Sequence, residues 1–367
     1  MKLWKKKLKD IYWIGKEDTC VIAISKKFLR TVIRRKVPLL DSCIKVIVGE
    51  RLIAKLHKKY GAHTQLLFMR GATGDVYIQF MVFNNWIREN NTNSYIIVSD
   101  ALSMTGVAEL FPEVEKVAIR GYFGDCIEKA FMLLGEEYLR LKVLFLWTYS
   151  LYINRCRVRM IEKFNFMDTY RWYVLGLKGE LHFEMPHFKE IESHEIEKLG
   201  LIKNKTVIIA PEANSVTQLS IAFWNEIIDQ LKELGFRVLV NCNNTQEYHT
   251  ETLFFKYSKG VPILEYAGCF VGIRSGLCDI LSTAQCRKII IYPKKAVNVN
   301  YNEHRSEIEF CGLRVMGLVG EDNNLIEVET PLVRNITQKE CEIKDGQQYR
   351  DEMSRLQNII INNILYK

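Results

Sequence analysis

Short apolar runs alternate along the chain with stretches in which apolar residues recur every three or four positions. In the first half, runs at Leu66–Met69, Ser94–Val98 and Val117–Arg120 predict strands. Helical spacing predicts helices at Val76–Arg88 and Ile127–Leu146. Strands that alternate with helices favour a parallel sheet with right-handed crossovers.

The second half repeats this alternation after the polar stretch Pro186–Asn204, which predicts a linker or a short helix. Strands are predicted at Thr206–Ala210 and Phe236–Asn241, with the amphipathic helix Ile221–Leu234 between them. The segment Leu264–Pro293 then reads as strand, tight turn, helix and strand. The fold class is therefore α/β, with two doubly wound Rossmann-like domains.

Weaker patterns lie at the ends of the two halves. Arg171–Leu177 and Glu180–Met185 read as the last strands of the first half, and Val315–Leu318 and Leu325–Val328 as edge strands of the second. One apolar stripe predicts a terminal helix at Gln347–Tyr366.

Four segments follow from these elements. We expect a basic N-terminal segment at 1–62, which packs on or extends the first domain, and that domain at 63–186. A second domain is expected at 187–340, and a C-terminal helix at 341–367 that returns to the first domain.

Residues 143–153, VLFLWTYSLYI, form a dense apolar and aromatic patch. A buried core helix is one interpretation. The other is a groove or interfacial element for a lipid-linked or aromatic partner. In the N-terminal segment, Thr19–Ile24 and Lys45–Val48 could be strands, and Ile44–Tyr60 could equally be a helix.

Composition adds a cellular setting. The 367 residues are 48% hydrophobic, and the 10 cysteines are scattered without a CxxC pair. This favours a reducing compartment and neither a disulfide framework nor a zinc site. Without an apolar signal region or a run long enough to span a membrane, we expect a cytoplasmic protein, peripheral at most to the inner face of a membrane.

Positive charge is concentrated at the start of the chain. Residues 1–60 hold 17 Lys or Arg against 5 Asp or Glu, whereas the whole chain carries only +8. A solvated basic face explains this, as does attraction to an anionic membrane or to nucleic acid. Trp4, Tyr12 and Trp13 among the lysines favour the membrane, and no nucleic-acid module accompanies the charge.

The turn after the predicted strand Phe270–Ile273 carries candidate chemistry. Arg274 supplies charged donors, Ser275 a hydroxyl, and Gly276 permits close approach to the backbone. A helix start also favours an anion such as a phosphate. The alternative is an ordinary strand-to-helix turn with Ser275 as its N-cap.

Three motifs resemble those of the heptosyltransferase-like bacterial glycosyltransferases, of GT-B architecture, over roughly residues 64–330. They are the strand and glycine loop LLFMRGATGDVYIQF, the second-domain opening TVIIAPEANSVTQLSIAFWNEIIDQLKELGFRVLVN, and the turn CFVGIRSGLCDILSTAQCRKIIIYP. The resemblance implies two domains facing across a cleft. The sequence departs from the family at two places. The family carries a Lys in the donor loop, where this chain has Thr217-Gln218-Leu219-Ser220. In the turn, Arg274 and Asp279 replace an Asp and a His of the family. The donor therefore need not be ADP-heptose, and GDP- and UDP-sugars are equally open.

The resemblance implies a metal-independent glycosyltransferase. It would move a sugar from a nucleotide-diphosphate donor to a hydroxyl of a bacterial cell-surface glycan or lipid-linked acceptor, with no cofactor beyond this co-substrate. No Asp-x-Asp pair stands in an apolar-flanked loop to bind a metal. Two alternatives are a GT-B-type sugar-nucleotide epimerase and a non-catalytic protein that binds glycan or lipid.

The same resemblance implies roles for particular residues. Asp75 matches the family's Gly-Asp carboxylate and is the expected base, the alternative being a helix cap. Arg274 is the expected diphosphate clamp, and Asp279 would hold a donor hydroxyl or orient Arg274. The other expected site residues are Ser275, Gly276, Glu212, Asn214, Ser215 and Asn241 on the donor side, and Arg70, Gly71 and Gly74 on the acceptor side or its loop.

Overall fold

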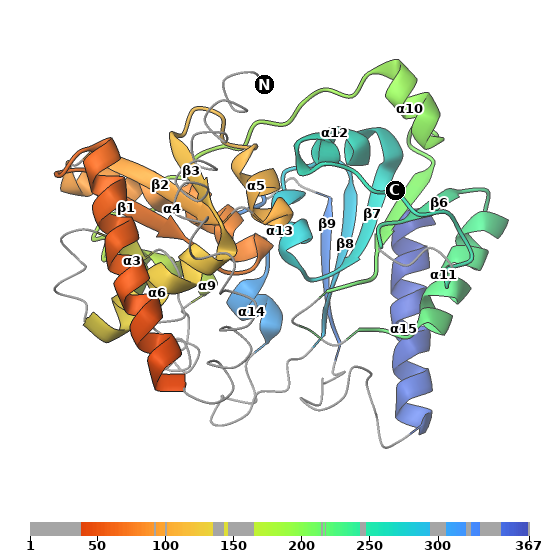
Figure 1. Cartoon of the computed structure of the whole chain (residues 1–367). Helices are drawn as coiled ribbons and strands as arrows, with labels where there is room; N and C mark the ends of the chain where they lie inside the picture. Colours follow the sequence, from red (N-terminus) through yellow and green to blue (C-terminus); the bar gives the residue numbers. More distant parts are fainter. Residues whose placement is uncertain are drawn as a thin grey trace, which may run out of the picture. The chain divides into compact units, whose positions relative to one another are not determined.

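The computed structural model describes much of the chain as two α/β units (Figure 1). The described residues are 38–91, 93–99, 101–134, 143–145, 165–213, 216, 218–242, 247–293, 306–320, 324–330 and 346–365. Unit 1 comprises Met1–Leu151 with Tyr170–Pro186, and unit 2 comprises Tyr152–Thr169 with His187–Lys367. The predicted strand Thr19–Ile24 lies outside the described residues.

Unit 1 contains a four-stranded parallel sheet in the order β3-β2-β1-β4. The strands are β1 (Gln65–Met69), β2 (Ser94–Ser99), β3 (Lys116–Ile119) and β4 (Val143–Phe145). Each strand is short and apolar, as expected of a sheet that is covered on both faces.

Helices cover both faces of this sheet, so unit 1 is doubly wound as predicted. They are α3 (Pro38–Tyr60), α4 (Thr73–Asn90), α5 (Leu102–Ala108) and α6 (Gly121–Leu134). Because β4 pairs with the far side of β1, a right-handed crossover from β3 carries α6 over the face opposite α4 and α5. Leu66 and Phe68 of β1 pack there against Leu56 of α3 and Ile127 of α6.

A glycine allows α3 and α6 to lie side by side at close range (Figure 1). A Cβ atom built on Gly49 of α3 would lie 2.3 Å from the Cys126 carbonyl oxygen and 2.9 Å from the Ala130 Cβ. Any larger residue would push the two helices apart, so α3 is fitted to α6 at this position.

Several predictions for the first half are wrong. Ile44–Tyr60 is helical within α3, so the Lys45–Val48 strand does not form. The predicted helix Ile127–Leu146 ends at Leu134 in α6, and residues 143–145 of the apolar patch form strand β4 instead. A continuous apolar run reads alike as a buried strand or helix, which explains that error. The rest of the patch lies outside the described residues.

The predicted closing strands of the first half are also absent. Arg171 and its neighbours form a π-helix, η2 (Thr169–Val174), which follows the short helix α9 (Phe166–Asp168). Residues 180–185 form neither helix nor strand. Asn85, buried in α4, instead holds this segment, because its side chain donates to the His182 carbonyl and accepts from the His182 N–H, at 2.8 Å each.

Unit 2 contains a five-stranded parallel sheet in the order β6-β5-β7-β8-β9. Its strands are β5 (Thr206–Ala210), β6 (Arg237–Val240), β7 (Gly268–Ile273), β8 (Arg287–Pro293) and β9 (Leu325–Thr330). Four of them match the strands predicted in the second domain, and β9 confirms the edge strand at 325–328. The other predicted edge strand, at 315–318, is wrong because these residues lie in turns.

Helices also lie on both faces of the second sheet. They are α11 (Ile221–Glu233) and α15 (Gly346–Leu365) on one face and α12 (Tyr257–Ala267) on the other. The unit also contains the short helices α10 (Ser193–Leu199), which buries no residue, α13 (Gly276–Ile280) and α14 (Glu307–Cys311). The chain crosses back past β5 to reach β7, so a right-handed connection places α12 on the face opposite α11. This confirms the doubly wound fold class for the second unit.

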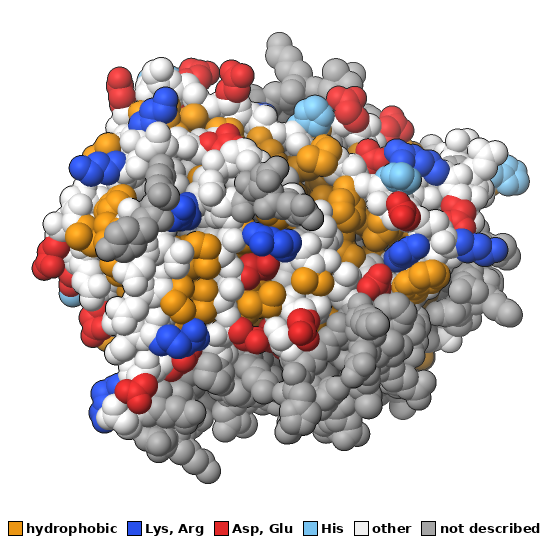
Figure 2. Space-filling model, turned by 180° about the vertical axis from the view of Figure 1, so that it is seen from behind, with side chains coloured by type: hydrophobic (Ala, Val, Ile, Leu, Met, Phe, Trp, Pro, Cys, Tyr) orange, Lys and Arg blue, Asp and Glu red, His pale blue; other side chains and the backbone are white. Residues whose placement is uncertain are grey.

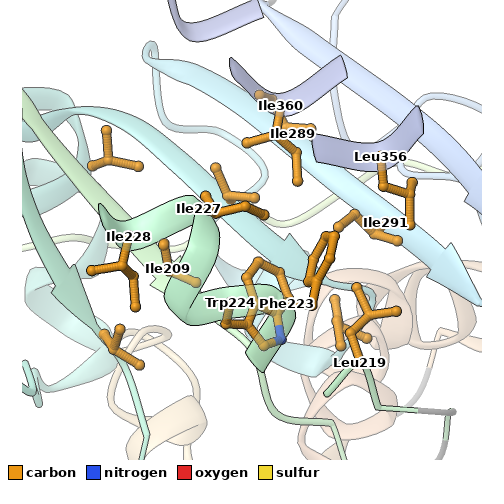
Figure 3. Packing of buried hydrophobic residues seen from close by; sticks show 14 of the residues in the cluster. Ile209, Leu219, Phe223, Trp224, Ile227, Ile228, Ile289, Ile291, Leu356 and Ile360 are labelled. Carbon is orange, nitrogen blue, oxygen red and sulfur yellow. The ribbon is translucent and has the colours of Figure 1, made fainter. Parts of the chain in front are cut away.

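The terminal helix α15 completes the core of unit 2. Its Leu356 and Ile360 pack in one cluster with Ile289 and Ile291 of β8 and with Trp224 of α11 (Figure 3). Because α11 and α15 share this cluster, they cover the same face of the sheet, α11 beside β5 and α15 over β8. The expectation that this helix returns to the first domain is therefore corrected, since its apolar stripe is buried within unit 2.

Candidate functional site

Polar residues follow two neighbouring strands of unit 2 where the order of the sheet reverses. Strand β5 is flanked by β6, the next strand in sequence, and by β7, so the β5–β7 boundary is a topological switch point. Ligands of open α/β sheets bind beyond the carboxyl ends of strands at such points. Ala210 pairs with Gly272, so Glu212 and Arg274 both follow two residues later at the same edge.

Arg274 is half-buried at this edge, and its guanidinium is bound on several sides. Its Nη2 lies 2.6 Å from Asp279 Oδ1, and its Nη1 donates to Asp279 Oδ2 at 3.1 Å. Nη1 also donates to the Ser275 carbonyl at 2.7 Å, and Nε to the Cys311 carbonyl at 3.2 Å. The guanidinium therefore joins the turn after β7 to the end of α14.

Charge balance sets the electrostatics of this turn. The Arg274 and Asp279 side chains are only 12% and 4% exposed. Burial alone would lower the pKa of Arg274, but the Asp279 carboxylate together with the nearby Tyr292, Cys311 and Cys278 outweighs burial, so the pKa is raised. Burial raises the pKa of the neighbouring Cys278 thiol. The positive charge of Arg274 is already neutralised by Asp279, so a diphosphate at this edge would have to compete with Asp279 for the guanidinium.

Ser275 and Gly276 form the turn itself. Ser275 occupies the N-cap position of α13, but its side chain makes no cap hydrogen bond there; its Oγ lies 3.7 Å from Cys278 Sγ. Helix α13 has five residues, so few aligned peptide dipoles support an anion at its start. A phosphate site at this turn is therefore supported mainly by its position at the carboxyl ends of β5 and β7, and less by the dipole of α13.

The other expected donor-side residues lie on neighbouring strand ends. Glu212 is half-buried after β5, and burial together with its nearby carboxylate raises the pKa of Tyr248. Asn241 follows β6, where its side chain donates to the Leu253 carbonyl at 2.8 Å. Asn214 and Ser215 lie outside the described residues.

In unit 1, the turn from β1 to α4 is tightly constrained. Gly71 has a φ of 129°, which residues with a side chain rarely adopt. Asp75 is the third residue of α4, and its Oδ2 accepts from the Ala72 N–H at 3.0 Å. Gly74 is buried in the first turn of the helix. Asp75 is therefore not the N-cap that the alternative interpretation predicted, because that position is held by Ala72; its carboxylate instead contacts the N-cap N–H from the third helical position, and this contact occupies one oxygen.

Arg70 pairs with two carboxylates that sequence reasoning missed. Its Nη2 donates to Asp125, and its Nε lies 3.1 Å from Glu128 Oε2. Burial raises the pKa of Glu128, against the opposing effect of Arg70. The signal in the sequence is two acids three residues apart, just after the predicted strand 117–120. A charged cluster therefore lies beside the glycine loop at the carboxyl edge of this sheet.

The described residues also bear on metals and membranes. Among them, no three His, Cys, Asp or Glu side chains are grouped so that they could hold a metal ion. Within the same part of the chain, every helix is too short or too polar to cross a membrane.

Comparison with known proteins places the fold. No protein-family model matches the sequence, and no curated protein matches it. Among solved structures, Escherichia coli ADP-heptose lipopolysaccharide heptosyltransferase II matches 82% of this chain and 98% of its own, with 14% identity and a TM-score of 0.51. A family 9 glycosyltransferase from Veillonella parvula matches 80% and 97%, with 11% identity and a TM-score of 0.45. Escherichia coli heptosyltransferase WaaC with ADP matches 82% and 99%, with 11% identity and a TM-score of 0.44.

The match to heptosyltransferase II establishes the fold. The chain has the two-unit α/β architecture of GT-B glycosyltransferases, and the resemblance predicted from three sequence motifs is confirmed at that level. At 14% identity, the match does not extend to the donor or the acceptor.

Proposed function

We propose that this protein is a glycosyltransferase that uses a nucleotide-diphosphate sugar and acts without a metal ion. Its acceptor would be a hydroxyl of a bacterial cell-surface glycan or a lipid-linked sugar. The observation that carries the proposal is the switch point of unit 2, where Glu212 and Arg274 follow paired strands in a chain with the fold of heptosyltransferase II.

On the donor side, the nucleotide diphosphate would lie over the ends of β5 and β7. The first N–H groups of a helix have no partner within it, so Gly276 and Leu277 are suited to donate to phosphate oxygens. Glu212 would accept hydrogen bonds from ribose or sugar hydroxyls, together with Asn214, Ser215 and Asn241. Arg274 would reach the diphosphate while Asp279 orients it.

On the acceptor side, Asp75 would accept the proton of the attacking hydroxyl. Only its Oδ2 is used by the Ala72 N–H, and within the described residues its Oδ1 has no hydrogen-bond partner. A carboxylate with one oxygen fixed and the other open suits a general base, because the fixed oxygen sets its direction. Gly71 and Gly74 would let the acceptor approach the loop backbone, next to Arg70.

A thermal-shift panel tests the donor side directly. The full chain is heated with UDP, GDP and ADP, with their common sugar conjugates, and with the matching monophosphates as controls. A ligand at 100 times its Kd stabilises the folded state by about 2.7 kcal/mol. We expect one base to stand out as diphosphate and sugar conjugate, and its monophosphate to shift Tm less. If no nucleotide raised the Tm, the donor site would be refuted.

Turnover with the selected donor separates the enzyme classes. A transferase consumes the donor rapidly only when an acceptor is supplied, whereas an epimerase converts the donor alone. Proton NMR of the donor-only incubation detects an epimer, which has the same mass as the donor, and mass spectrometry of the donor-plus-acceptor incubation detects a glycosylated acceptor.

One observation favours a second candidate, a protein that binds a sugar nucleotide or glycan without transfer. Residues 211–220 contain no Lys or Arg, and Arg274 at the neighbouring strand end is balanced by Asp279. A leaving diphosphate would therefore have little unbalanced positive charge to stabilise it. Tight donor binding with no turnover on a glycan and glycolipid acceptor panel would support this candidate.

For its location, we propose a cytoplasmic protein that associates with the inner face of a membrane. The support is the basic N-terminal segment, whose charge is not shared by the rest of the chain.

A further inference from the structure

Helix α3 presents one continuous stripe to solvent. Cys43, Ile47, Arg51, Ala54 and Lys58 are all exposed, and they recur every three or four residues along one side of the helix. Ile47, near the middle of the stripe, is a large apolar side chain that is 50% exposed. The stripe spans roughly 24 Å at 1.5 Å per residue.

The opposite side of α3 is fixed to unit 1. Leu52, Ile53 and Leu56 are buried in the core cluster that includes β1 and α6. Gly49 fits against the Cys126 carbonyl of α6, so the helix cannot roll without a steric clash. The exposed stripe therefore has a defined orientation on unit 1.

Charge on α3 has one predominant sign. The helix holds five Lys or Arg against one Asp and one Glu, and Lys45 is paired with Asp41 at 2.8 Å. The chain before it, residues 1–37, is also basic, with 12 Lys or Arg against 3 Asp or Glu. By contrast, basic and acidic side chains are mixed among the described residues on the face that Figure 2 shows.

We infer that the outer stripe of α3 docks on an anionic lipid bilayer. A helix at a membrane interface combines apolar side chains, which enter the acyl boundary, with Lys and Arg, which meet anionic head groups. Ile47 and Cys43 supply the apolar part, and Arg51 and Lys58 the basic part. This inference deepens the membrane association proposed above and does not depend on transferase activity.

The apolar part of the stripe favours a bilayer over nucleic acid as the partner. Phosphate backbones are bound mainly by Lys and Arg, with polar side chains and backbone N–H groups. Exposed Ile47 and Cys43 side chains would add little to such contacts, whereas the hydrocarbon of a bilayer would bury them. A vesicle and a nucleic-acid probe therefore distinguish the two partners.

The inference is tested by co-sedimentation of the full chain with lipid vesicles. One set contains phosphatidylcholine only, and the other also contains about 30% phosphatidylglycerol, a fraction at which anionic surface potential attracts basic segments. We expect binding to the anionic vesicles alone, and weaker binding as salt is raised, because salt screens the charges.

Paired variants locate the contact. Arg51→Glu with Lys58→Glu should weaken binding to anionic vesicles by at least about tenfold, since two attractive charges become repulsive. The matched control, Lys198→Glu with Lys203→Glu, changes the net charge equally at exposed positions of unit 2 and should leave binding unchanged. Ile47→Ser should weaken the part of the binding that persists at high salt. Circular dichroism checks that each variant folds.

Three outcomes would overturn the inference. The α3 variants could bind vesicles as well as the control pair does, in which case the basic residues before α3 carry any membrane contact. Neutral vesicles could bind as tightly as anionic ones. A duplex DNA probe could bind the full chain more tightly than the vesicles do and lose that binding in the α3 variants, which would identify the stripe as a nucleic-acid surface.

Discussion

Asp279 holds Arg274 through both carboxylate oxygens, with N···O distances of 2.6 and 3.1 Å, in a pair that solvent reaches mainly on the Arg274 side. The two residues are five apart, and the turn after β7 folds between them. Because Arg274 also binds the Ser275 and Cys311 carbonyls, the pair fixes the shape of the strand end where the donor is proposed to bind.

Breaking this pair should be costly. Asp279→Ala leaves a buried guanidinium without its counter-charge, and we expect a loss of about 3–5 kcal/mol in the free energy of unfolding. The double variant Arg274→Met with Asp279→Leu removes both charges and should recover most of that loss. Urea denaturation of the three proteins measures the difference. Equal destabilisation of the single and double variants would show that charge pairing is not the cause.

Arg274 should also affect donor binding if it reaches the diphosphate. Arg274→Ala is expected to raise the Kd of the donor at least about tenfold, which corresponds to ~1.4 kcal/mol. Isothermal calorimetry with the nucleotide selected by the thermal-shift panel measures this change. An unchanged Kd in a folded variant would limit Arg274 to its structural contacts.

Asp75→Asn separates catalysis from capping. The amide keeps the size of the side chain and an oxygen that can accept from the Ala72 N–H, but it cannot take a proton. We expect turnover to fall by a factor of about 100 or more, with donor Kd and Tm almost unchanged. A large fall in Tm with retained turnover would instead support the helix-cap role alone.

Gly49→Ala tests the fit between α3 and α6. The added methyl would lie 2.3 Å from the Cys126 carbonyl oxygen, so the helices must move apart. Overpacking of this kind costs about 1–3 kcal/mol, against a gain of about 1 kcal/mol from helix propensity. Thermal denaturation should therefore show a net loss of stability. Ala54→Ser on the exposed side of α3 is the control and should change stability little.

Lys288 should make stability depend on pH above neutrality. Its side chain is 1% exposed and donates to the Ala284 carbonyl, and burial lowers its pKa from 10.5 to about 8. Between these values the folded amine is neutral while the unfolded amine keeps its proton. The unfolded state therefore binds more protons, and the contribution of this residue to stability rises with pH.

Lys288→Met removes this titration. Any stability that Met gains over Lys at pH 7 should shrink by roughly 2–3 kcal/mol as the pH rises to about 10. Urea denaturation of both proteins across this range gives the difference, and exposed Lys198→Met is the control. A difference that stays constant with pH would contradict the assigned pKa.

Local pattern was enough to predict most strands, because each is a short apolar run bounded by a turn. It failed at residues 143–145, where a continuous apolar run carries no period that separates strand from helix. It also failed for the packing of α15. The apolar stripe that includes Leu356 shows that one side of α15 is buried, but only the strand order shows that the surface it covers belongs to the sheet of unit 2.

The candidate site was predictable at the strand ends and not in its ion pairs. Sequence places Arg274 and Asp75 after strands; Arg274 directly follows β7, whereas Asp75 lies in the first turn of α4, which begins at Thr73 and not after Asp75. The pairing of Arg70 with Asp125 and Glu128 depends on strand order, since the crossover from β3 to β4 carries α6 past the end of β1. No spacing within one element reveals that contact.

Gln79, fully buried in α4, accepts from the Arg70 N–H at 3.0 Å and donates to the Arg70 carbonyl at 2.7 Å. The Gln79 side chain thus makes the two backbone hydrogen bonds with Arg70 that a neighbouring strand would make within a sheet. The glycine loop is consequently braced by the helix it leads into, and its shape is set before any substrate arrives. Strand, loop and helix therefore behave as one preorganised unit.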